Sequence, residues 1–565
     1  KLLFMLADPE VSADQLAAAA RGFGAVFEVP CRPHWPHFEG RAQAPWRRLK
    51  IGFLSPDFRV HSVMYFVEGI LAQLDRRQFE VFALYLFPRD DHVTERVKRH
   101  ADHFVRLGGF TPDQQAEMIR AQGIDILVDL AGHTGHNGLL AMARKAAPVQ
   151  ATWVGFPGTT GLSAMDYLIT DSITDPPGVE DEYTEALYRL PTRLCTYRPM
   201  SRNLLWRYQP RYLVQPAPAL ANGHITFGSC NNLGKITDQV LSLWGQILAR
   251  TPGSRLLIEA KNFGKSQFIE EYKERCGRLG IDPERLILVP LDTKNQYLTY
   301  HRIDIALDPF PLNGGTTSMD ALWMGTPLVG LAGTSFKSRL TAGILGHLGR
   351  NEWLAQTAEE YVDIACRLAN DTPALAAMRQ NLRAELEQSA LMNEDIFLPI
   401  FGDALRDMWF RWQAAQEAPG NDALQAQKIN EWIVQMPAPL RDEAAPIGVG
   451  IAPGQRVALS EAHEMLQKLV DTAKDKSPQP QHDQLVDPRW VEVTQLSETV
   501  LAAVPHDPVA LACLAEVEFA HSHVEFAVTY LRYAEEAIAR KFGAATGSGA
   551  AAAAAAAGAE EATAS

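Results

Sequence analysis

Residues 303–333 read IDIALDPFPLNGGTTSMDALWMGTPLVGLAG: a short apolar run, a glycine turn, an apolar-periodic segment and a second apolar run. This order predicts two parallel strands joined by a crossover helix. The turn sets Gly314 and Gly315 directly before Thr316 and Thr317, where the helix should begin. Free backbone N–H groups, two hydroxyls and the positive end of a helix dipole would face a ligand there, as in diphosphate sites. The alternative is an ordinary strand, turn and helix with Thr N-caps.

The same alternation extends to both sides of this segment. Before it, HITFGSC, RLLIEA and RLILVP are predicted strands, with helices expected at residues 237–250 and 268–279. An earlier set begins at residue 49 and contains LKIGFLS, FEVFALYLF, DILVDLAG, VQATWVGFPG and MDYLITD. Two successive Rossmann-like sheets predict an α/β fold whose substrate cleft lies between the halves, at the carboxyl ends of the strands.

The patterning divides the 565 residues into five segments. We predict a helical lead-in and linker at 1–48, an N-terminal Rossmann-like half at 49–220 and a C-terminal half at 221–412. Beyond Gln413 only helical periodicity remains, so an all-α module is expected at 413–542. Within it, residues 511–534 are spaced like one tetratricopeptide repeat (TPR). The Ala-rich tail at 543–565 lacks large apolar groups and is expected to be disordered.

Composition excludes several classes of protein. With 47% apolar and 21% charged residues the chain resembles an ordinary globular protein, and the net charge of −14 disfavours a nucleic-acid partner. Its six cysteines form no C-x-x-C pair, which favours a reducing cytoplasm over a disulfide framework. The apolar run at residues 1–7 is too short for a membrane span, and we expect no signal peptide. Since the chain begins with Lys, a missing upstream domain stays an open hypothesis.

A second loop favours phosphate binding. The stretch FGSCNNLGKI places Asn231, Asn232 and Lys235 between the first strand of the second half and its helix. A lysine there can set a compact positive charge against a departing phosphate. The alternative is a solvated surface lysine. Both loops follow strands of one predicted sheet, so we expect them to meet at one ligand.

Polar residues also follow strands in the first half. Asp57 and His61 come after its first strand, and His133 and His136 come after a later one. A histidine at such a position can accept a hydroxyl proton or hold a phosphate, although structural or merely exposed roles are the alternative. The spacing of His133 and His136 also suggests zinc. Neither a third ligand nor a neighbouring Glu accompanies the pair, so we expect no metal.

Five motifs occur in order between Leu49 and about Trp412: KIGFLSPDFRVHSV, DILVDLAGHTGHN, PVQATWVGFPGTTG with MDYLITD, FGSCNNLGKI and NGGTTSMDALWMGTPLV. This string resembles glycosyltransferase family 41, which contains the O-GlcNAc transferases and a bacterial branch that glucosylates asparagine. The resemblance implies a GT-B fold of two facing Rossmann-like domains. It also implies a UDP-sugar donor, inversion at the anomeric carbon, and no metal or other cofactor.

The resemblance also implies roles for single residues. Lys235 matches the lysine that meets the UDP diphosphate, and Thr316 and Thr317 match the paired threonines of the phosphate-binding helix. Asp320 matches the acidic residue that contacts the ribose, and His61 matches a histidine discussed as a catalytic or acceptor-site group. Asn232 and Gln296 fall near the diphosphate and the uridine. Asp57, His133 and His136 are candidates on the acceptor side.

The sequence departs from the animal enzymes of this family at three positions. Gly315 and Gln296 stand where those enzymes have histidines, and Gly234 stands where they have a tyrosine. These changes leave the donor sugar open between GlcNAc and glucose. The helical module at the C-terminal end is a further departure, because the family's repeats usually precede the catalytic halves.

We therefore expect a cytoplasmic, metal-independent, inverting enzyme that moves GlcNAc from a UDP-sugar to Ser or Thr hydroxyls of a protein or peptide acceptor. The absence of D-x-D from the sequence agrees with metal independence. One alternative is a UDP-glucose-dependent asparagine N-glucosyltransferase. A non-catalytic helical-repeat scaffold and a sugar-nucleotide epimerase on the same architecture are the others.

Overall fold

The computed structural model describes residues 2–41, 44–199, 204–293, 297–475, 488–521 and 523–542. The chain forms two compact units. Unit 1 holds residues 1–94, 103–199 and 214–445, and unit 2 holds residues 95–102, 200–213 and 446–565. Gln296 and the Ala-rich tail, for which we predicted a donor contact and disorder, lie outside the described residues.

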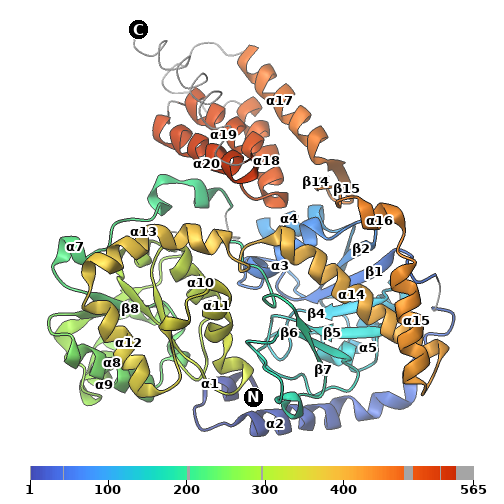
Figure 1. Ribbon diagram of the computed structural model, residues 1–565, viewed down its shortest axis with the longest axis horizontal. Helices are drawn as coiled ribbons and strands as arrows, with labels where there is room; N and C mark the ends of the chain where they lie inside the picture. Colours follow the sequence, from blue (N-terminus) through green and yellow to red (C-terminus); the bar gives the residue numbers. More distant parts are fainter. Residues whose placement is uncertain are drawn as a thin grey trace. The chain divides into compact units, whose positions relative to one another are not determined.

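The first half of unit 1 is built on a parallel sheet (Figure 1). In the described residues this sheet has seven strands, in the order β3-β2-β1-β4-β5-β6-β7. The strands are β1 (Leu49–Ser55), β2 (Phe79–Tyr85), β3 (His103–Arg106), β4 (Ile126–Asp129), β5 (Val149–Thr152), β6 (Tyr167–Asp171) and β7 (Ala186–Leu190). Their connections include α3 (Met64–Gln73), α4 (His92–His100), α5 (Pro112–Gln122) and α6 (Leu139–Met142). The strand order reverses between β1 and β4, where a doubly wound sheet opens a crevice for ligands.

The second half repeats this plan. Its described strands are ordered β10-β9-β8-β11-β12-β13 and are likewise parallel. They are β8 (Thr226–Ser229), β9 (Arg255–Ala260), β10 (Leu286–Pro290), β11 (Ile305–Leu307), β12 (Leu328–Leu331) and β13 (Leu354–Ala355). The helices are α7 (Ala219–Asn222), α8 (Asp238–Arg250), α9 (Ser266–Arg278), α10 (Thr316–Trp323), α11 (Leu340–Leu348), α12 (Ala358–Ala369) and α13 (Thr372–Gln388). Here the order reverses between β8 and β11.

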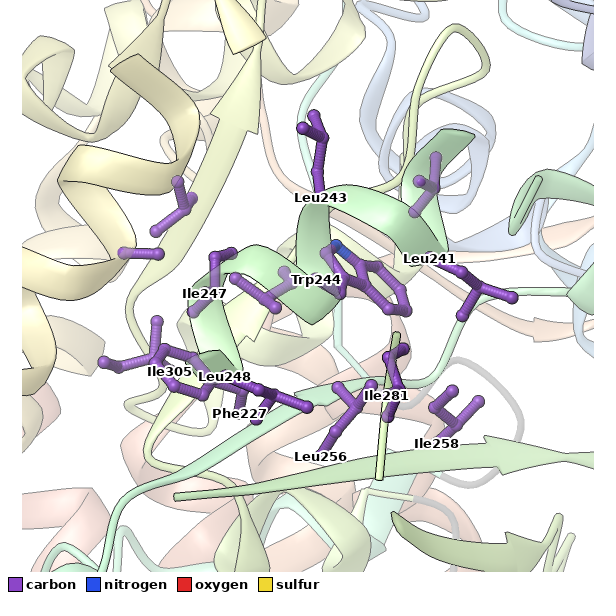
Figure 2. Close-up of a cluster of buried hydrophobic side chains, with 14 of the residues drawn as sticks. Phe227, Leu241, Leu243, Trp244, Ile247, Leu248, Leu256, Ile258, Ile281 and Ile305 are labelled. Carbon is purple, nitrogen blue, oxygen red and sulfur yellow. The ribbon is translucent and has the colours of Figure 1, made fainter. Parts of the chain in front are cut away.

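The core of the second half supports the loops above it. Figure 2 shows Trp244 of α8 among the apolar side chains that pack between this helix and the sheet, including Phe227, Leu256 and Ile305. The Trp244 indole donates a hydrogen bond of 3.1 Å to the Tyr361 hydroxyl, which in turn donates to the carbonyl oxygen of Asp308 at 3.0 Å. The end of β11 is therefore fixed from beneath by core residues.

Two further segments complete unit 1. Helix α14 (Glu394–Glu417) follows α13 and returns to the first half, where Phe401 packs against Trp153 with ring centroids 4.8 Å apart. Helices α15 (Asp422–Val434) and α16 (Ala438–Asp442) also belong to this unit. At the start of the chain lie α1 (Leu2–Ala7) and α2 (Ala13–Phe27), which bury Leu6 and Leu16 in a cluster with Phe156 and Leu312.

Unit 2 contains a two-stranded hairpin followed by helices. The hairpin is β14 (Gly448–Ala452) with β15 (Gln455–Ala458), and the helices are α17 (Leu459–Asp475), α18 (Pro488–Ala503), α19 (Pro508–Ala520) and α20 (Val524–Phe542). Our expectation of helices alone beyond Gln413 is therefore wrong at this hairpin. The Pro and Gly residues at 446–454 favour a loop locally, and cross-strand pairing overrides that local signal. The TPR-like stretch forms the packed pair α19 and α20.

None of the helices in the described part of the chain combines the length and the apolar character that a bilayer crossing requires.

Candidate donor and acceptor site

The candidate donor loops lie at the strand-order reversal of the second sheet. Asn231, Asn232 and Lys235 follow β8, and Asp308 and the glycine turn follow β11. These two strands pair directly, with Ile305 opposite Phe227. Parallel neighbours end at the same edge of a sheet, so the fold brings the two predicted phosphate loops together.

Lys235 reaches from one loop to the other. Its Nζ atom donates a hydrogen bond of 2.6 Å to the carbonyl oxygen of Asn313, in the glycine turn. Burial lowers the pKa of this ammonium group, and the charge of Asp308 partly opposes that effect. The bond fixes the ammonium group beside the turn that leads into α10. Lys235 is therefore not a solvated surface lysine, which was the alternative.

Asp308 shapes the glycine turn. Its fully buried carboxylate accepts hydrogen bonds from the Gly314 amide at 2.9 Å, the Ser318 hydroxyl at 3.1 Å and the Thr341 hydroxyl at 2.5 Å. Burial raises the pKa of this carboxyl, while these donors and Lys235 oppose the rise. One buried acid thus ties the turn both to the first turn of α10 and to α11.

The first turn of α10 is open to an anion. Gly315 is its N-cap residue and places no capping side chain on the helix amides, which leaves the positive end of the helix unblocked. The Thr317 hydroxyl donates a hydrogen bond of 2.8 Å to the Asn231 side-chain oxygen and so links the helix to the β8 loop. A Cβ atom added at Gly315 would meet nothing within 4 Å, so this position has room for a larger side chain.

Asp320 is buried one turn into α10. Tyr197, on the segment after β7, donates a hydrogen bond to it from its hydroxyl group. Burial raises the pKa of the Asp320 carboxyl to about 7, while hydrogen bonds from Tyr197 and Tyr297 limit the rise. The Tyr197 ring stacks on Tyr65 of α3 with centroids 5.9 Å apart. The predicted ribose-binding acid is therefore linked to the first half of unit 1.

His61 and Asp57 lie in the loop after β1. Nδ1 of His61 is 3.5 Å from Oδ2 of Asp57, and the Val63 amide donates a hydrogen bond of 3.3 Å to the same nitrogen. The two contacts favour opposite ring tautomers, since the carboxylate attracts a proton to Nδ1 whereas the amide requires its lone pair. Burial lowers the pKa of His61, Asp57 opposes this and Arg59 adds to it. The imidazole is therefore mainly neutral at pH 7.

His133 and His136 have different surroundings. Nε2 of His133 lies 2.8 Å from the Thr160 carbonyl oxygen, and the ring packs edge-on against Phe156 at 5.3 Å. Burial lowers its pKa to about 4. His136 is exposed and meets the edge of Phe87 at 5.3 Å. The described residues contain no group of three or more His, Cys, Asp or Glu side chains placed to hold a metal ion.

The model of the family described as glycosyl transferase family 41 matches residues 28–204 and 214–399. The chain belongs to glycosyl transferase family 41. The match covers both Rossmann-like halves and includes each candidate residue named above.

Several relatives resemble this family 41 chain. It is 36% identical over 423 residues to the probable UDP-N-acetylglucosamine–peptide N-acetylglucosaminyltransferase SPINDLY of Petunia hybrida, across 73% of this chain and 44% of the relative. The corresponding enzyme of Caenorhabditis elegans is 25% identical across 65% of this chain and 41% of its own length. The chain thus spans less than half the length of these curated relatives.

A solved structure is similar over most of the chain. A mutant of the Thermobaculum terrenum O-GlcNAc transferase superposes with a TM-score of 0.67 at 34% sequence identity. The match covers 74% of this chain and 77% of that one. The two facing Rossmann-like domains of a GT-B fold, predicted from the sequence, are therefore confirmed.

The fold also reveals site residues in this family 41 chain that the motifs did not. Asp308, Asn313 and Tyr197 contact the predicted donor loops. Asn313 begins the motif NGGTTSMDALWMGTPLV, which assigned it no role, and Tyr197 lies outside the motifs. Asp308 ends the apolar run IALD, and a polar residue at that point was the signal available. Asn232 is exposed, and its side-chain oxygen accepts a hydrogen bond of 2.9 Å from the Gly234 amide.

Proposed function

We propose that this chain transfers GlcNAc from UDP-GlcNAc to Ser or Thr hydroxyls of a protein or peptide acceptor. One observation carries the proposal: Lys235 is bonded to the glycine turn beneath the uncapped first turn of α10. A lysine and a helix N-terminus at one point form a receptor for a diphosphate without a metal ion. The family 41 relatives described above are UDP-N-acetylglucosamine–peptide N-acetylglucosaminyltransferases, which supports this choice of sugar and of a peptide acceptor.

The proposed reaction is a single in-line displacement that inverts the anomeric carbon. The acceptor oxygen forms a bond to that carbon while the bond from the carbon to the β-phosphate oxygen breaks, and UDP leaves with the bonding pair. Lys235 and the amides of residues 315–317 stabilise the growing negative charge. One such donor is typically worth about 10²–10³ in rate. Asp320 holds the ribose, and Asn232 lies toward the diphosphate.

The acceptor loses a proton in this step, and His61 is the proposed base. Its lowered pKa keeps the imidazole neutral at pH 7. In that role Nδ1 carries a proton directed at Asp57, and Nε2 accepts the proton of the acceptor hydroxyl. Asp57 then orients the ring. We assign His133 a supporting place in the loop and His136 a place at the acceptor surface.

We further propose that no metal is required and that the protein works in a reducing compartment such as the cytoplasm. All six cysteines are free thiols, which agrees with such a compartment. The carboxylates of Asp308, Asp320 and Asp57 contact protein groups, which supports phosphate neutralisation by Lys235 rather than by a metal ion.

The test incubates the chain with extracts of candidate acceptor proteins in parallel reactions. Each reaction contains UDP-GlcNAc, UDP-glucose or a GDP-sugar, and the GDP-sugar is the control for recognition of the uracil base. Mass spectrometry then locates the added sugar. GlcNAc on Ser or Thr supports the proposal, whereas glucose on Asn supports N-glucosylation. Release of a free epimerised sugar, or no reaction although UDP binds, favours the epimerase or the scaffold.

A further inference from the structure

Three loops meet at the carboxyl edge of the first sheet. Arg59 follows β1, Phe87 follows β2 and His136 follows β4, and these strands are neighbours in the order β2-β1-β4. The Arg59 guanidinium carbon lies 4.6 Å from the centroid of the Phe87 ring. His136 meets the edge of the same ring at 5.3 Å. Arg59, Phe87 and His136 therefore form one surface, called here the Arg59 surface.

Contacts with protein groups fix the Arg59 side chain. Its Nη2 atom lies 3.2 Å from Oδ1 of Asp57, and its Nε atom donates to the Pro56 carbonyl oxygen at 3.3 Å. The other carboxylate oxygen of Asp57 faces His61 at 3.5 Å. One buried acid thus holds the guanidinium and the imidazole side by side. The Arg59 side chain is 31% exposed against 6% for Asp57, so it presents positive charge to solvent next to His61.

The acids around this surface are already engaged. Asp91 accepts hydrogen bonds from the Val60 amide at 2.7 Å and the Val93 amide at 2.9 Å. Asp90 forms an ion pair of 2.5 Å with Arg106. Asp57, the ion-pair partner of Arg59, is buried, so the guanidinium is the part of this pair that reaches solvent, on a chain whose net charge is −14. The guanidinium carbon lies over the Phe87 ring, and Asp57 and Pro56 take up Nη2 and Nε, so Nη1 is the donor that this geometry offers to a carboxylate.

We propose that the Arg59 surface binds an acidic side chain, Asp or Glu, of the acceptor polypeptide close to the residue that receives the sugar. This inference rests on the proposed function, in which His61 faces the acceptor hydroxyl. An acceptor that reaches His61 passes within one or two residues of Arg59, because both side chains contact Asp57. The surface then selects among acceptors by charge, and the donor loops of the second half take no part in that choice.

The test uses the full chain, UDP-GlcNAc and a positional-scanning library of Ser- and Thr-containing peptides. Each flanking position holds Glu, Gln or Lys in turn. The parent should prefer Glu to Lys about fivefold or more at one position, as expected for a partly exposed charge-assisted pair. Arg59→Gln should remove the preference, and Arg59→Glu should reverse it toward Lys. Arg250→Gln, which breaks an exposed ion pair on α8, is the matched control and should keep the parental preference.

Three results would overturn the inference while leaving the proposed function intact. In the first, the parent transfers sugar with no charge preference. In the second, the Arg59→Gln variant keeps the parental preference. In the third, the only defect of the Arg59→Gln variant is in the KM for UDP-GlcNAc. Transfer by the parent to no peptide or protein would instead overturn the proposed function itself. The parental measurement needs no variant, so a variant that failed to fold would still leave the inference falsifiable.

Discussion

The hydroxyl group of Tyr197 donates a hydrogen bond to Oδ1 of Asp320, which joins the segment leaving the first sheet to the helix after the glycine turn of the second. The Tyr197 ring lies parallel to Tyr65, four residues beyond His61 in the sequence. The proposed ribose-binding acid and the proposed acceptor loop are thus connected through two tyrosines. Donor affinity in the second half should depend on a residue of the first.

Tyr197→Phe removes this hydrogen bond and keeps the stacked ring. It should destabilise the fold by about 1 kcal/mol and weaken UDP binding several-fold, because Asp320 loses a donor that orients its carboxyl group and lowers the pKa of that group. Thermal unfolding and titration calorimetry with UDP measure the two effects. Tyr188→Phe is the control, because it removes a comparable hydrogen bond outside the candidate site. The Tyr188 hydroxyl donates this bond to Asp407 over 2.9 Å. Equal UDP affinities in both variants would contradict the link.

Lys235→Ala should lower turnover by about 10² or more. The substitution removes the cation that faces the departing phosphate and leaves the Asn313 carbonyl without its donor. Steady-state transfer measures the loss. Lys145→Ala, which breaks a partly buried ion pair with Asp166, controls for destabilisation alone. Turnover within threefold of the parent would remove Lys235 from the donor site.

His61→Ala should reduce turnover and leave UDP affinity unchanged, because the base acts on the proton of the acceptor. The pKa of His61 is lowered by burial, so transfer by the parent should persist below pH 6.5 and fail only as the ring is protonated at still lower pH. Asp57→Asn should also reduce turnover, since the ring loses the carboxylate that favours a proton on Nδ1. If His61→Ala changes only the acceptor KM, the residue shapes the acceptor site and is not the base.

The stability of the protein should fall as pH rises toward and through 7, in part because of Asp320. Its folded-state pKa of about 7 exceeds the ordinary value of 3.8, so the folded state holds the proton more tightly than the unfolded chain does. Stability from this group is present below about pH 4 and is lost as pH rises through 7, up to about 4 kcal/mol as an upper bound. Asp320→Asn should flatten that part of a Tm-against-pH curve. A curve identical to the parental one would show that Asp320 ionises normally.

Transfer should survive chelation. Lys235 and the first turn of α10 offer positive charge to the diphosphate, and we therefore expect activity in EDTA within about twofold of the untreated enzyme. The comparison uses dialysed protein assayed with EDTA, Mg²⁺ or Mn²⁺. If EDTA abolished transfer activity and either metal ion restored it, the main counter-charge to the diphosphate would be the metal ion and not Lys235.

The sequence by itself determined the parallel sheets. Strands and crossover helices must bury their apolar faces, so short apolar runs that alternate with helically spaced apolar residues predict these elements locally. It also placed Lys235, Thr316 and Thr317 at strand ends, where a doubly wound sheet gathers its ligands. The sequence did not predict the hairpin at Gly448–Ala458, because its Gly and Pro residues favour a loop locally and only the pairing between strands stabilises the hairpin. Tertiary structure alone decided that Lys235 bonds to Asn313, that Tyr197 reaches Asp320 and that Arg59 lies on Phe87. Each of these contacts joins residues far apart in the sequence or on separate strands, and only packing of the sheets and their loops determines which side chains become neighbours.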